Sequence, residues 1–314
     1  MNREPIPVWL LTGFLGSGKT SLLLNWLRAE ALSNAAVVIN EVGDVGLDNT
    51  LIGGAVDSAS VLLGNCVCCS GLEGLEATLS DLWWDRLYRK RPKFDAVVIE
   101  TTGLANPRSI QTVFKQHPFL KERYRLRATL TTVSASHGLD VLKTFDESVS
   151  QVKAADVILL THVDLDDAAP VLQSIHAMNS RAVCLPSPKA SVSWDAVMVA
   201  IQTLASRTAC VEDTFAQTKN ELTPHHSHTA SVRFVATPQF ADVKALMAFV
   251  APLITTHLIR LKGIVALQDG KMFVVHWVMC DKQASVVLYT GAAPQDFGLT
   301  CIVANHGVID DSAP

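Results

Sequence analysis

The amino-acid sequence predicts an α/β protein with a mostly parallel, doubly wound sheet and a smaller α+β domain after it. From residue 7 to about 204, apolar strand-length segments alternate with helix-length segments, which is typical of a parallel sheet covered by helices on both faces. From residue 230 onward one helix stands among several short strands, which favours antiparallel pairing. We therefore predict domains at 1–204 and 230–314, joined by a linker at 205–229 that carries a histidine tract.

The expected elements follow from the periodicity of the apolar residues. The strands expected in the first domain are Val8–Thr12, Ala36–Ile39, Ser60–Leu63, Ala96–Glu100, Leu126–Val133, Val157–Leu160 and Ala182–Leu185, with helices at 72–89 and 166–178 among those between them. The second domain is expected to have one helix, Phe240–Val250, opened by Pro238. Its expected strands are Ser231–Val235, Leu258–Leu267, Met272–Met279, Ser285–Tyr289 and Thr300–Val303.

Composition excludes several classes of protein. The formal net charge of −4 gives no electrostatic footprint for nucleic acid. The apolar runs are too short to span a bilayer, and residues 1–7 lead into no signal-like core. We therefore expect a cytoplasmic protein with neither a nucleic-acid nor a membrane partner. In that reducing compartment, the seven cysteines favour thiol or metal chemistry over a disulfide framework.

The strongest motif is the sequence GFLGSGKT at residues 13–20, which fits the phosphate-binding pattern GxxxxGK[ST] between a strand and a helix. Its glycines let backbone amides surround phosphates at a helix N-terminus. We expect Lys19 to reach the outer phosphates and the Thr20 hydroxyl to bind Mg²⁺. The predicted phosphate-binding residues are Gly13, Gly16, Ser17, Gly18, Lys19 and Thr20. The chain is therefore expected to bind a nucleoside triphosphate.

Two further segments are expected near the phosphates. Glu100 ends an apolar strand, where P-loop proteins place the acid of the Mg²⁺ shell, and Gly103 is positioned to sense the γ-phosphate. The alternative for Glu100 is a solvated residue at a strand end. The segment 40–48 is acidic and punctuated by glycine, as a mobile loop near Mg²⁺ would be; the alternative is an ordinary αβ turn.

The base-reading segment is predicted at Thr161-His162-Val163-Asp164. A carboxylate at Asp164 accepts two hydrogen bonds from the edge of guanine, whereas adenine offers no matching pair of donors. The competing interpretation is that Asp164 is an ordinary helix N-cap.

Three cysteines, Cys66, Cys68 and Cys69, lie within four residues after the third expected strand. Thiolates are preferred ligands of Zn²⁺ and Cu⁺, and an open fourth position would suit transfer of the ion. Glu41 or Asp44 is expected to supply a nearby acid. Buried apolar thiols or a redox pair are the alternatives. The other cysteines, 184, 210, 280 and 301, are expected in the core, and His225, His226 and His228 belong equally well to a solvated linker or to a metal site.

Together these motifs resemble the CobW-type metal-chaperone GTPases, relatives of the urease and hydrogenase nickel-insertion GTPases. The resemblance rests on GFLGSGKT, the Asn40–Asp48 loop, Cys66-Val67-Cys68-Cys69, Glu100-Thr101-Thr102-Gly103 and Arg260-Leu261-Lys262-Gly263. It implies a first domain that binds GTP and Mg²⁺ and a cysteine site for a divalent metal, often zinc. It also implies that nucleotide state controls delivery of the metal to a client protein.

The chain departs from the family pattern at three places. Thr161-His162 stands where the family has Asn or Thr followed by Lys, and that lysine normally packs along the nucleotide. Asp44 replaces a glutamate, and Gly64-Asn65 replaces Asn-Gly before the cysteines.

Three functions are compatible with the sequence. The leading one is a GTP-hydrolysing metallochaperone with slow basal turnover, because Leu104 stands where Ras-type GTPases place a water-orienting glutamine. The second is a nucleotide-binding metal buffer or sensor without significant turnover. The third is a P-loop kinase for a small metabolite. The client, the physiological metal and the oligomeric state, a homo-oligomer included, stay open.

Overall fold

A computed structural model describes residues 4–39, 61–63, 72–209, 230–255, 257–279, 281, 283–290 and 297–304. The chain forms two compact units, and the described residues up to 209 fall in the first and those from 230 onward in the second. Helix α10 (Trp194–Ala209) continues past the domain end predicted at residue 204. The predicted division into domains and linker stays a prediction.

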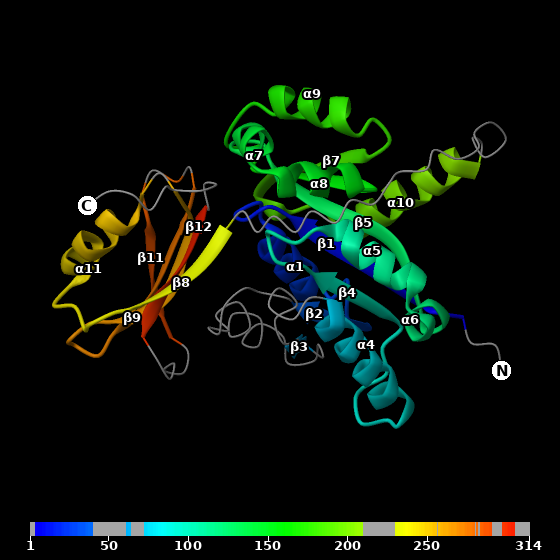
Figure 1. The fold of residues 1–314 in the computed structure, drawn as a ribbon, viewed down its shortest axis with the longest axis horizontal. Helices are drawn as coiled ribbons and strands as arrows, with labels where there is room; N and C mark the ends of the chain where they lie inside the picture. The colour runs from blue at the N-terminus through cyan, green and yellow to red at the C-terminus, as the bar shows by residue number, and fades with distance from the viewer. Residues whose placement is uncertain are drawn as a thin grey trace, which may run out of the picture. The chain divides into compact units, whose positions relative to one another are not determined.

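The first unit contains a seven-stranded sheet in the order β3-β2-β4-β1-β5-β6-β7, and every pairing in it is parallel (Figure 1). Its strands are β1 (Ile6–Gly13), β2 (Ala35–Ile39), β3 (Val61–Leu63), β4 (Ala96–Glu100), β5 (Tyr124–Ser134), β6 (Val157–Thr161) and β7 (Val183–Ser187). The chain leaves β1 toward β2 on one side, while β5 lies on the other side of β1. In such sheets ligands bind at the carboxyl ends of the strands, where the strand order reverses.

Helices cover both faces of this sheet, as the apolar residues of its strands require. They are α1 (Lys19–Arg28), α4 (Leu72–Leu87), α5 (Pro107–Gln116), α6 (Pro118–Arg123), α7 (Gly138–Thr144), α8 (Asp146–Ala154), α9 (Ala169–Met178) and α10, with the 3₁₀ turn η1 (Pro188–Ala190). Neighbouring strand residues enter different cores. Leu11 and Val98 pack with α1 and α10, whereas Leu10 and Val97 pack with α4, α5 and α6. The doubly wound α/β fold is therefore confirmed.

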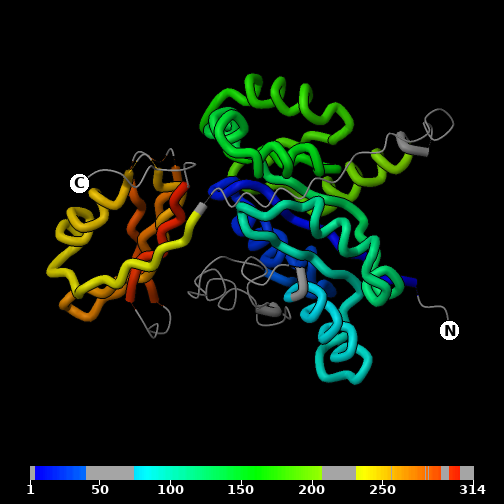
Figure 2. The backbone as a smooth tube through the Cα atoms, viewed as in Figure 1, coloured from blue at the N-terminus to red at the C-terminus, as the bar shows by residue number. Residues whose placement is uncertain are grey.

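The second unit has a five-stranded antiparallel sheet in the order β11-β10-β9-β12-β8. The strands are β8 (Ala230–Ala236), β9 (Leu258–Ala266), β10 (Met272–Val278), β11 (Ser285–Tyr289) and β12 (Gly298–Ala304). Figure 2 shows helix α11 (Val243–Val250) on one side of this sheet, followed by the 3₁₀ turn η2 (Ala251–Leu253). Leu246 and Val250 of α11 are fully buried against it. The predicted α+β domain is confirmed.

One predicted helix start was wrong. Helix α11 begins at Val243, because the Asp242 side chain caps it by accepting a 2.7 Å hydrogen bond from the Ala245 amide. Phe240, predicted to be helical, instead exchanges backbone hydrogen bonds with Ala266 and Gln268 beside β9. Pro238 therefore lies in the loop before the helix and does not open it.

Candidate nucleotide-binding site

The turn between β1 and α1 has the backbone that its glycines permit. Gly13, Gly16 and Gly18 have φ angles of 141°, 75° and 90°, which other residues rarely adopt. A Cβ on Gly13 would also collide with Thr132. The spacing of these glycines thus reflects the geometry of the turn, and the amides at the start of α1 are available to an anion.

Lys19 folds back over this turn. Its ammonium donates hydrogen bonds to the carbonyls of Gly13, at 2.8 Å, and of Phe14, at 3.1 Å. Only 8% of the lysine is exposed. The positive charge therefore lies where the predicted phosphates would bind, held by two neutral carbonyl groups that a phosphate can outcompete.

Thr20 and Glu100 come together at the same edge of the sheet. The Thr20 hydroxyl donates a 2.6 Å hydrogen bond to the Glu100 carboxylate, and Glu100 is 4% exposed. Oxygen donors of these two kinds suit Mg²⁺. The solvated alternative for Glu100 was wrong, because its carboxylate is buried beside the turn, and the donor set fits the ion expected from the sequence.

A group of buried hydroxyls joins the turn to the neighbouring strands. Ser17 Oγ donates to the Phe14 carbonyl at 2.7 Å and lies 2.6 Å from Thr132 Oγ1 of β5. Thr161 at the end of β6 donates to the Ser17 carbonyl at 2.8 Å. Thr161 was predicted as part of the base-reading segment, whereas Thr132 was missed, because a threonine inside an apolar strand gives no motif of its own.

The segment after β4 contacts the turn through Gly103. A Cβ at this position would lie 2.6 Å from the side chain and backbone nitrogen of Leu15. The Gln151 side chain of α8 donates to the carbonyls of Gly103, at 2.9 Å, and of Ala105, at 3.1 Å. Gln151 is 1% exposed and was also missed, since the sequence gives no reason to place α8 beneath this segment.

The predicted base-reading residues follow β6. Asp164 is exposed, and its carboxylate accepts a 3.2 Å hydrogen bond from the Lys189 amide. His162 has a φ angle of 56°, and its Nδ1 lies 2.9 Å from Ser134 Oγ. Lys189 and Ala190 also have positive φ angles, 49° and 55°. Two loops with uncommon backbone thus meet at Asp164, with its carboxylate at the surface where a base would reach it.

The glycine turn, the buried Glu100 and the predicted base-reading residues thus lie at the carboxyl ends of β1, β4 and β6. The model of the CobW/HypB/UreG nucleotide-binding domain matches residues 7–186. The chain belongs to this family.

Three relatives illustrate the similarity within the CobW/HypB/UreG family. The zinc chaperone YjiA of Escherichia coli is 41% identical over 57% of this chain and 56% of its own length. The zinc-regulated GTPase metalloprotein activator 1 of Schizosaccharomyces pombe is 36% identical over 52% of this chain and 40% of its own length. The zinc chaperone CobW of Sinorhizobium sp is 24% identical over 85% of this chain and 80% of its own length. The chain thus spans about half the length of the first two relatives.

The residues predicted to bind zinc are not among those that the structure describes. Cys66, Cys68, Cys69, Glu41 and Asp44 lie outside the described residues, as do the three histidines at 225, 226 and 228. Within the part of the chain that the structure describes, no group of three or more His, Cys, Asp or Glu side chains is arranged to hold a metal ion.

Two cysteines predicted to be core residues are described. Cys301 is 4% exposed among the apolar residues of the second unit, and Cys184 is partly buried against the core beside α9. Burial raises the pKa of both thiols, which disfavours the thiolate that metal binding requires. The prediction is confirmed for these two cysteines.

In the described segments, every helix is either too short or too polar to span a bilayer.

Proposed function

We propose that this protein hydrolyses GTP and uses its nucleotide state to control the binding and delivery of a divalent metal, zinc before others, to a client metalloprotein. The observation that carries the proposal is the hydrogen bond between Thr20 and the buried Glu100, beside the glycine turn and Lys19. Membership of the CobW/HypB/UreG family supports it, as do the names of relatives described as zinc chaperones and as a zinc-regulated GTPase.

Each residue of the site has a role in this proposal. The Gly13, Gly16, Ser17 and Gly18 backbone surrounds the phosphates, and Lys19 exchanges its carbonyl partners for phosphate oxygens. Thr20 and Glu100 would hold Mg²⁺, which would neutralise negative charge on the phosphates. Gly103 lies next to the turn at Leu15, so a change at the phosphates reaches the segment after β4 through direct contact.

Guanine recognition belongs to Thr161, His162 and Asp164 in this proposal. The exposed Asp164 carboxylate accepts from the guanine edge, and His162 occupies the place of the family's lysine. Because Ser134 holds the imidazole at Nδ1, the ring has a defined orientation beside the nucleotide.

Zinc is the cargo, and we assign it to Cys66, Cys68 and Cys69, with Glu41 or Asp44 as a nearby acid. We also propose a cytoplasmic location and the domain division 1–204, 205–229 and 230–314. The two rival functions are a buffer without turnover and a small-molecule kinase, and both would use the same nucleotide site.

Two measurements on the full chain test the proposal. We expect GTP hydrolysis that Lys19→Ala abolishes, and release of bound zinc to a chromophoric chelator that differs between GTP- and GDP-bound protein. Zinc release that is the same in both states would refute nucleotide-controlled delivery. Transfer of phosphate to one member of a metabolite panel, in place of water, would favour the kinase.

A further inference from the structure

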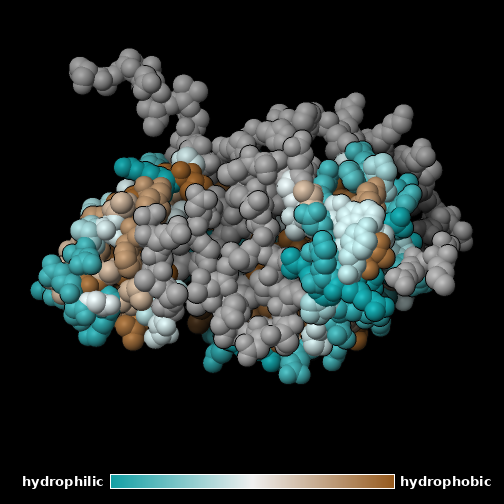
Figure 3. Space-filling view, turned by 90° about the horizontal axis from the view of Figure 1, so that it is seen from below, coloured by the Kyte–Doolittle hydropathy of each residue, from teal (hydrophilic) through white to brown (hydrophobic). Residues whose placement is uncertain are grey.

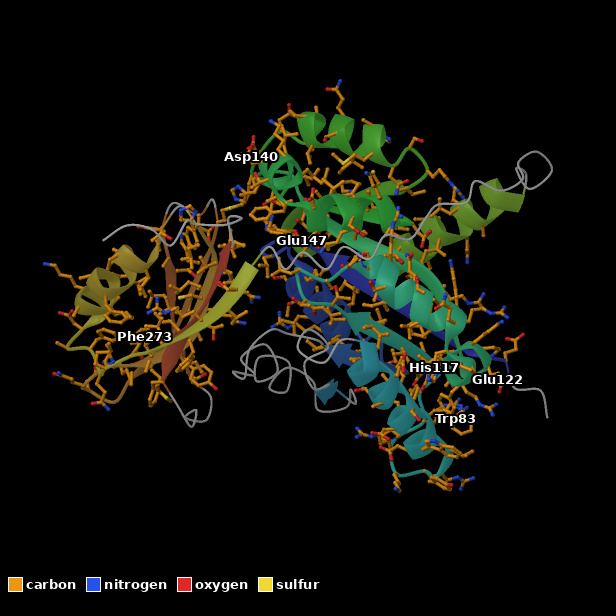
Figure 4. The ribbon with its side chains drawn as sticks, in the orientation of Figure 1. Trp83, His117, Glu122, Asp140, Glu147 and Phe273 are labelled. Carbon is orange, nitrogen blue, oxygen red and sulfur yellow. The ribbon has the colours of Figure 1, made fainter. Side chains whose placement is uncertain are left out.

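An aromatic strip lies on the surface at the end of α4. It consists of Trp83, Trp84, Tyr88 and Phe119, the last from α6. The Trp84 and Tyr88 rings stack with centroids 5.8 Å apart and planes at 17°, and Trp84 stacks on Phe119 at 6.5 Å. Trp83 meets Phe119 edge-on at 5.7 Å. Figure 4 shows Trp83 beside the labelled α6 neighbours His117 and Glu122.

Much of this strip is exposed. Trp84 is 42% exposed, Tyr88 64%, and the adjacent Leu87 44%. Large apolar side chains of this kind contribute most to binding when a partner covers them. Figure 3 shows the molecule from the side on which α4 lies. Less hydrophilic residues, coloured white or brown, lie there among hydrophilic residues coloured teal.

The strip is held in place. On the opposite side of α4, Leu75, Leu79 and Leu82 are buried against the sheet. Tyr124, whose pKa is raised by burial, donates a 2.8 Å hydrogen bond to the Leu79 carbonyl. His117, the N-cap residue of α6, also lies 3.5 Å from Glu76 of α4. The helix that carries the rings is therefore fixed to the sheet and to α6, so a partner need not order α4 when it binds.

Positive charges border the strip. Arg123 lies over the Trp83 ring at 4.7 Å, and Lys90 lies 6.0 Å from the centre of the Tyr88 ring. Arg91 is paired with Asp85, and Arg86 and Lys93 share Asp95. Within the described chain, Arg89, Lys90 and Lys121 form no ion pair with a carboxylate, and all three are exposed. The strip therefore has local cations available to an acidic partner.

The strip is separate from the nucleotide site. Helix α4 follows β3 and precedes β4, so it runs from the carboxyl edge of the parallel sheet back to its amino edge. The glycine turn and Glu100 lie at the carboxyl edge, whereas the strip lies at the far end of α4. In sequence, α4 begins three residues after Cys69.

We propose that the aromatic strip and its cations are the docking surface for an acidic segment of the client protein, with an aliphatic or aromatic side chain covering Trp84. This rests on the proposed delivery function, which requires a client. Exposed rings accept the apolar anchor, and Arg89, Lys90 and Lys121 meet the acidic residues.

Two other occupants fit less well. Single-stranded nucleic acid stacks its bases on rings that stand apart along a basic groove. Here Trp84 already stacks on two rings, and the chain has a net charge of −4. A second copy of the chain would bring two sets of these cations into one interface, and like charges near each other are unfavourable there.

The test uses the full chain and a fluorescein-labelled peptide in which Glu and Asp alternate with Leu and Phe. Fluorescence anisotropy measures its affinity at low and high salt. We expect Trp84→Ala/Tyr88→Ala and Lys90→Glu each to weaken binding by about tenfold or more. A neutral peptide, with Gln and Asn in place of Glu and Asp, should bind the parent protein weakly. Its affinity should match that of the acidic peptide for the Lys90→Glu variant.

Two substitutions elsewhere serve as matched controls. Leu165 is 69% exposed in another loop, so Leu165→Ala removes an exposed apolar side chain outside the strip. Arg125→Glu reverses a charge next to Tyr124, but side chains alternate along β5, so Arg125 faces away from α4. Both variants should bind the acidic peptide as the parent does. Thermal melting establishes that every variant is folded.

Several results would overturn the docking surface. One is equal peptide affinity in parent and strip variants, and another is tighter binding of a poly-dT oligonucleotide than of the acidic peptide. A parent dimer that dissociates on Trp84→Ala/Tyr88→Ala, seen by light scattering, would assign the strip to self-association. If the peptide binds but zinc release does not depend on nucleotide, the delivery function is refuted and the docking surface is retained. If zinc release depends on nucleotide but the peptide does not bind, the docking surface is refuted and the delivery function is retained.

Discussion

Gly103 and Leu15 are in contact where the segment after β4 meets the glycine turn. A Cβ on Gly103 would lie 2.6 Å from both the side chain and the backbone nitrogen of Leu15. No side chain fits in that space without a shift of one backbone or the other. The two segments that would contact the γ-phosphate are thus held against each other in the described structure.

Replacing Gly103 with alanine should therefore disturb the turn. Overpacking of this kind costs about 1–3 kcal/mol, and we expect a lower melting temperature together with weaker binding of a fluorescent GTP analogue. Leu15→Ala in the same chain removes the side-chain collision but leaves the backbone one, so the double variant should recover only part of the loss. Full affinity in Gly103→Ala alone would contradict this account.

Gln151 should matter for both stability and nucleotide binding. Gln151→Leu leaves the carbonyls of Gly103 and Ala105 without their side-chain donor, and an unsatisfied buried group costs about 1–3 kcal/mol. Gln111 is a matched control, because its amide also donates to two oxygens, Thr129 Oγ1 at 2.8 Å and the Ala154 carbonyl at 3.2 Å. We expect both leucine variants to melt earlier and only Gln151→Leu to bind GTP more weakly.

Equal loss of GTP affinity in the two variants would show that general destabilisation is responsible. Isothermal titration at a temperature well below either melting point separates the two effects.

The contrast between Lys19 and Gln151 shows what the sequence reveals of this site. Lys19 belongs to a contiguous motif whose geometry is local, so residues 13–20 suffice to predict it. Gln151 contacts Gly103 and Ala105, which precede it in the sequence by 48 and 46 positions. These contacts depend on how α8 packs. Glu100 is an intermediate case. The sequence shows that it ends a strand, but its burial beside Thr20 depends on the pairing of β1 with β4.

Element ends show the same limit at a smaller scale. The strand Ala96–Glu100 was predicted at its observed bounds, because an apolar run ends there at a charge. The start of α11 was not, because Phe240 is held beside β9 by backbone hydrogen bonds that the apolar pattern does not encode.

Asp164 should determine the preference for guanine. Asp164→Asn replaces one acceptor by a donor, so it should weaken GTP binding and strengthen binding of xanthosine triphosphate by more than about fivefold, from the cost of unpaired polar groups. Asp166→Asn is the control, because Asp166 is an exposed neighbour whose carboxylate accepts from the Asp167 amide. Competition binding with GTP, ATP and xanthosine triphosphate measures the change. Equal affinity of the parent for ATP and GTP would refute guanine recognition.

Basal GTP hydrolysis should be slow. Leu104 is apolar and partly buried after Gly103, and it cannot orient an attacking water as a glutamine would. Lys19→Ala should abolish the remaining activity. Lys189→Ala should preserve it, because Lys189 contacts Asp164 through its backbone amide and not through its ammonium group. Phosphate release measured without added metal other than Mg²⁺ tests this. Rapid turnover by the zinc-free parent would contradict it.

The cysteine motif should bind one zinc ion, and its affinity should be coupled to nucleotide. Cys66→Ser/Cys68→Ser should lose tight zinc binding, whereas Cys184→Ser/Cys301→Ser should keep it, because burial raises the pKa of those two thiols and keeps them protonated. Zinc competes with protons for the thiolates of Cys66, Cys68 and Cys69, so its affinity should fall as the pH is lowered below neutrality.

Coupling between the two ligands must be reciprocal. If a non-hydrolysable GTP analogue changes zinc affinity by some factor, zinc must change the affinity for that analogue by the same factor, and about 1–3 kcal/mol is typical of such coupling. Titrations of zinc with and without the analogue, and of the analogue with and without zinc, measure both factors independently. In Cys66→Ser/Cys68→Ser both should become one. Unequal factors in the parent would reveal a second zinc site. If neither GDP nor the analogue changes zinc affinity, both ligands bind but there is no switch between them.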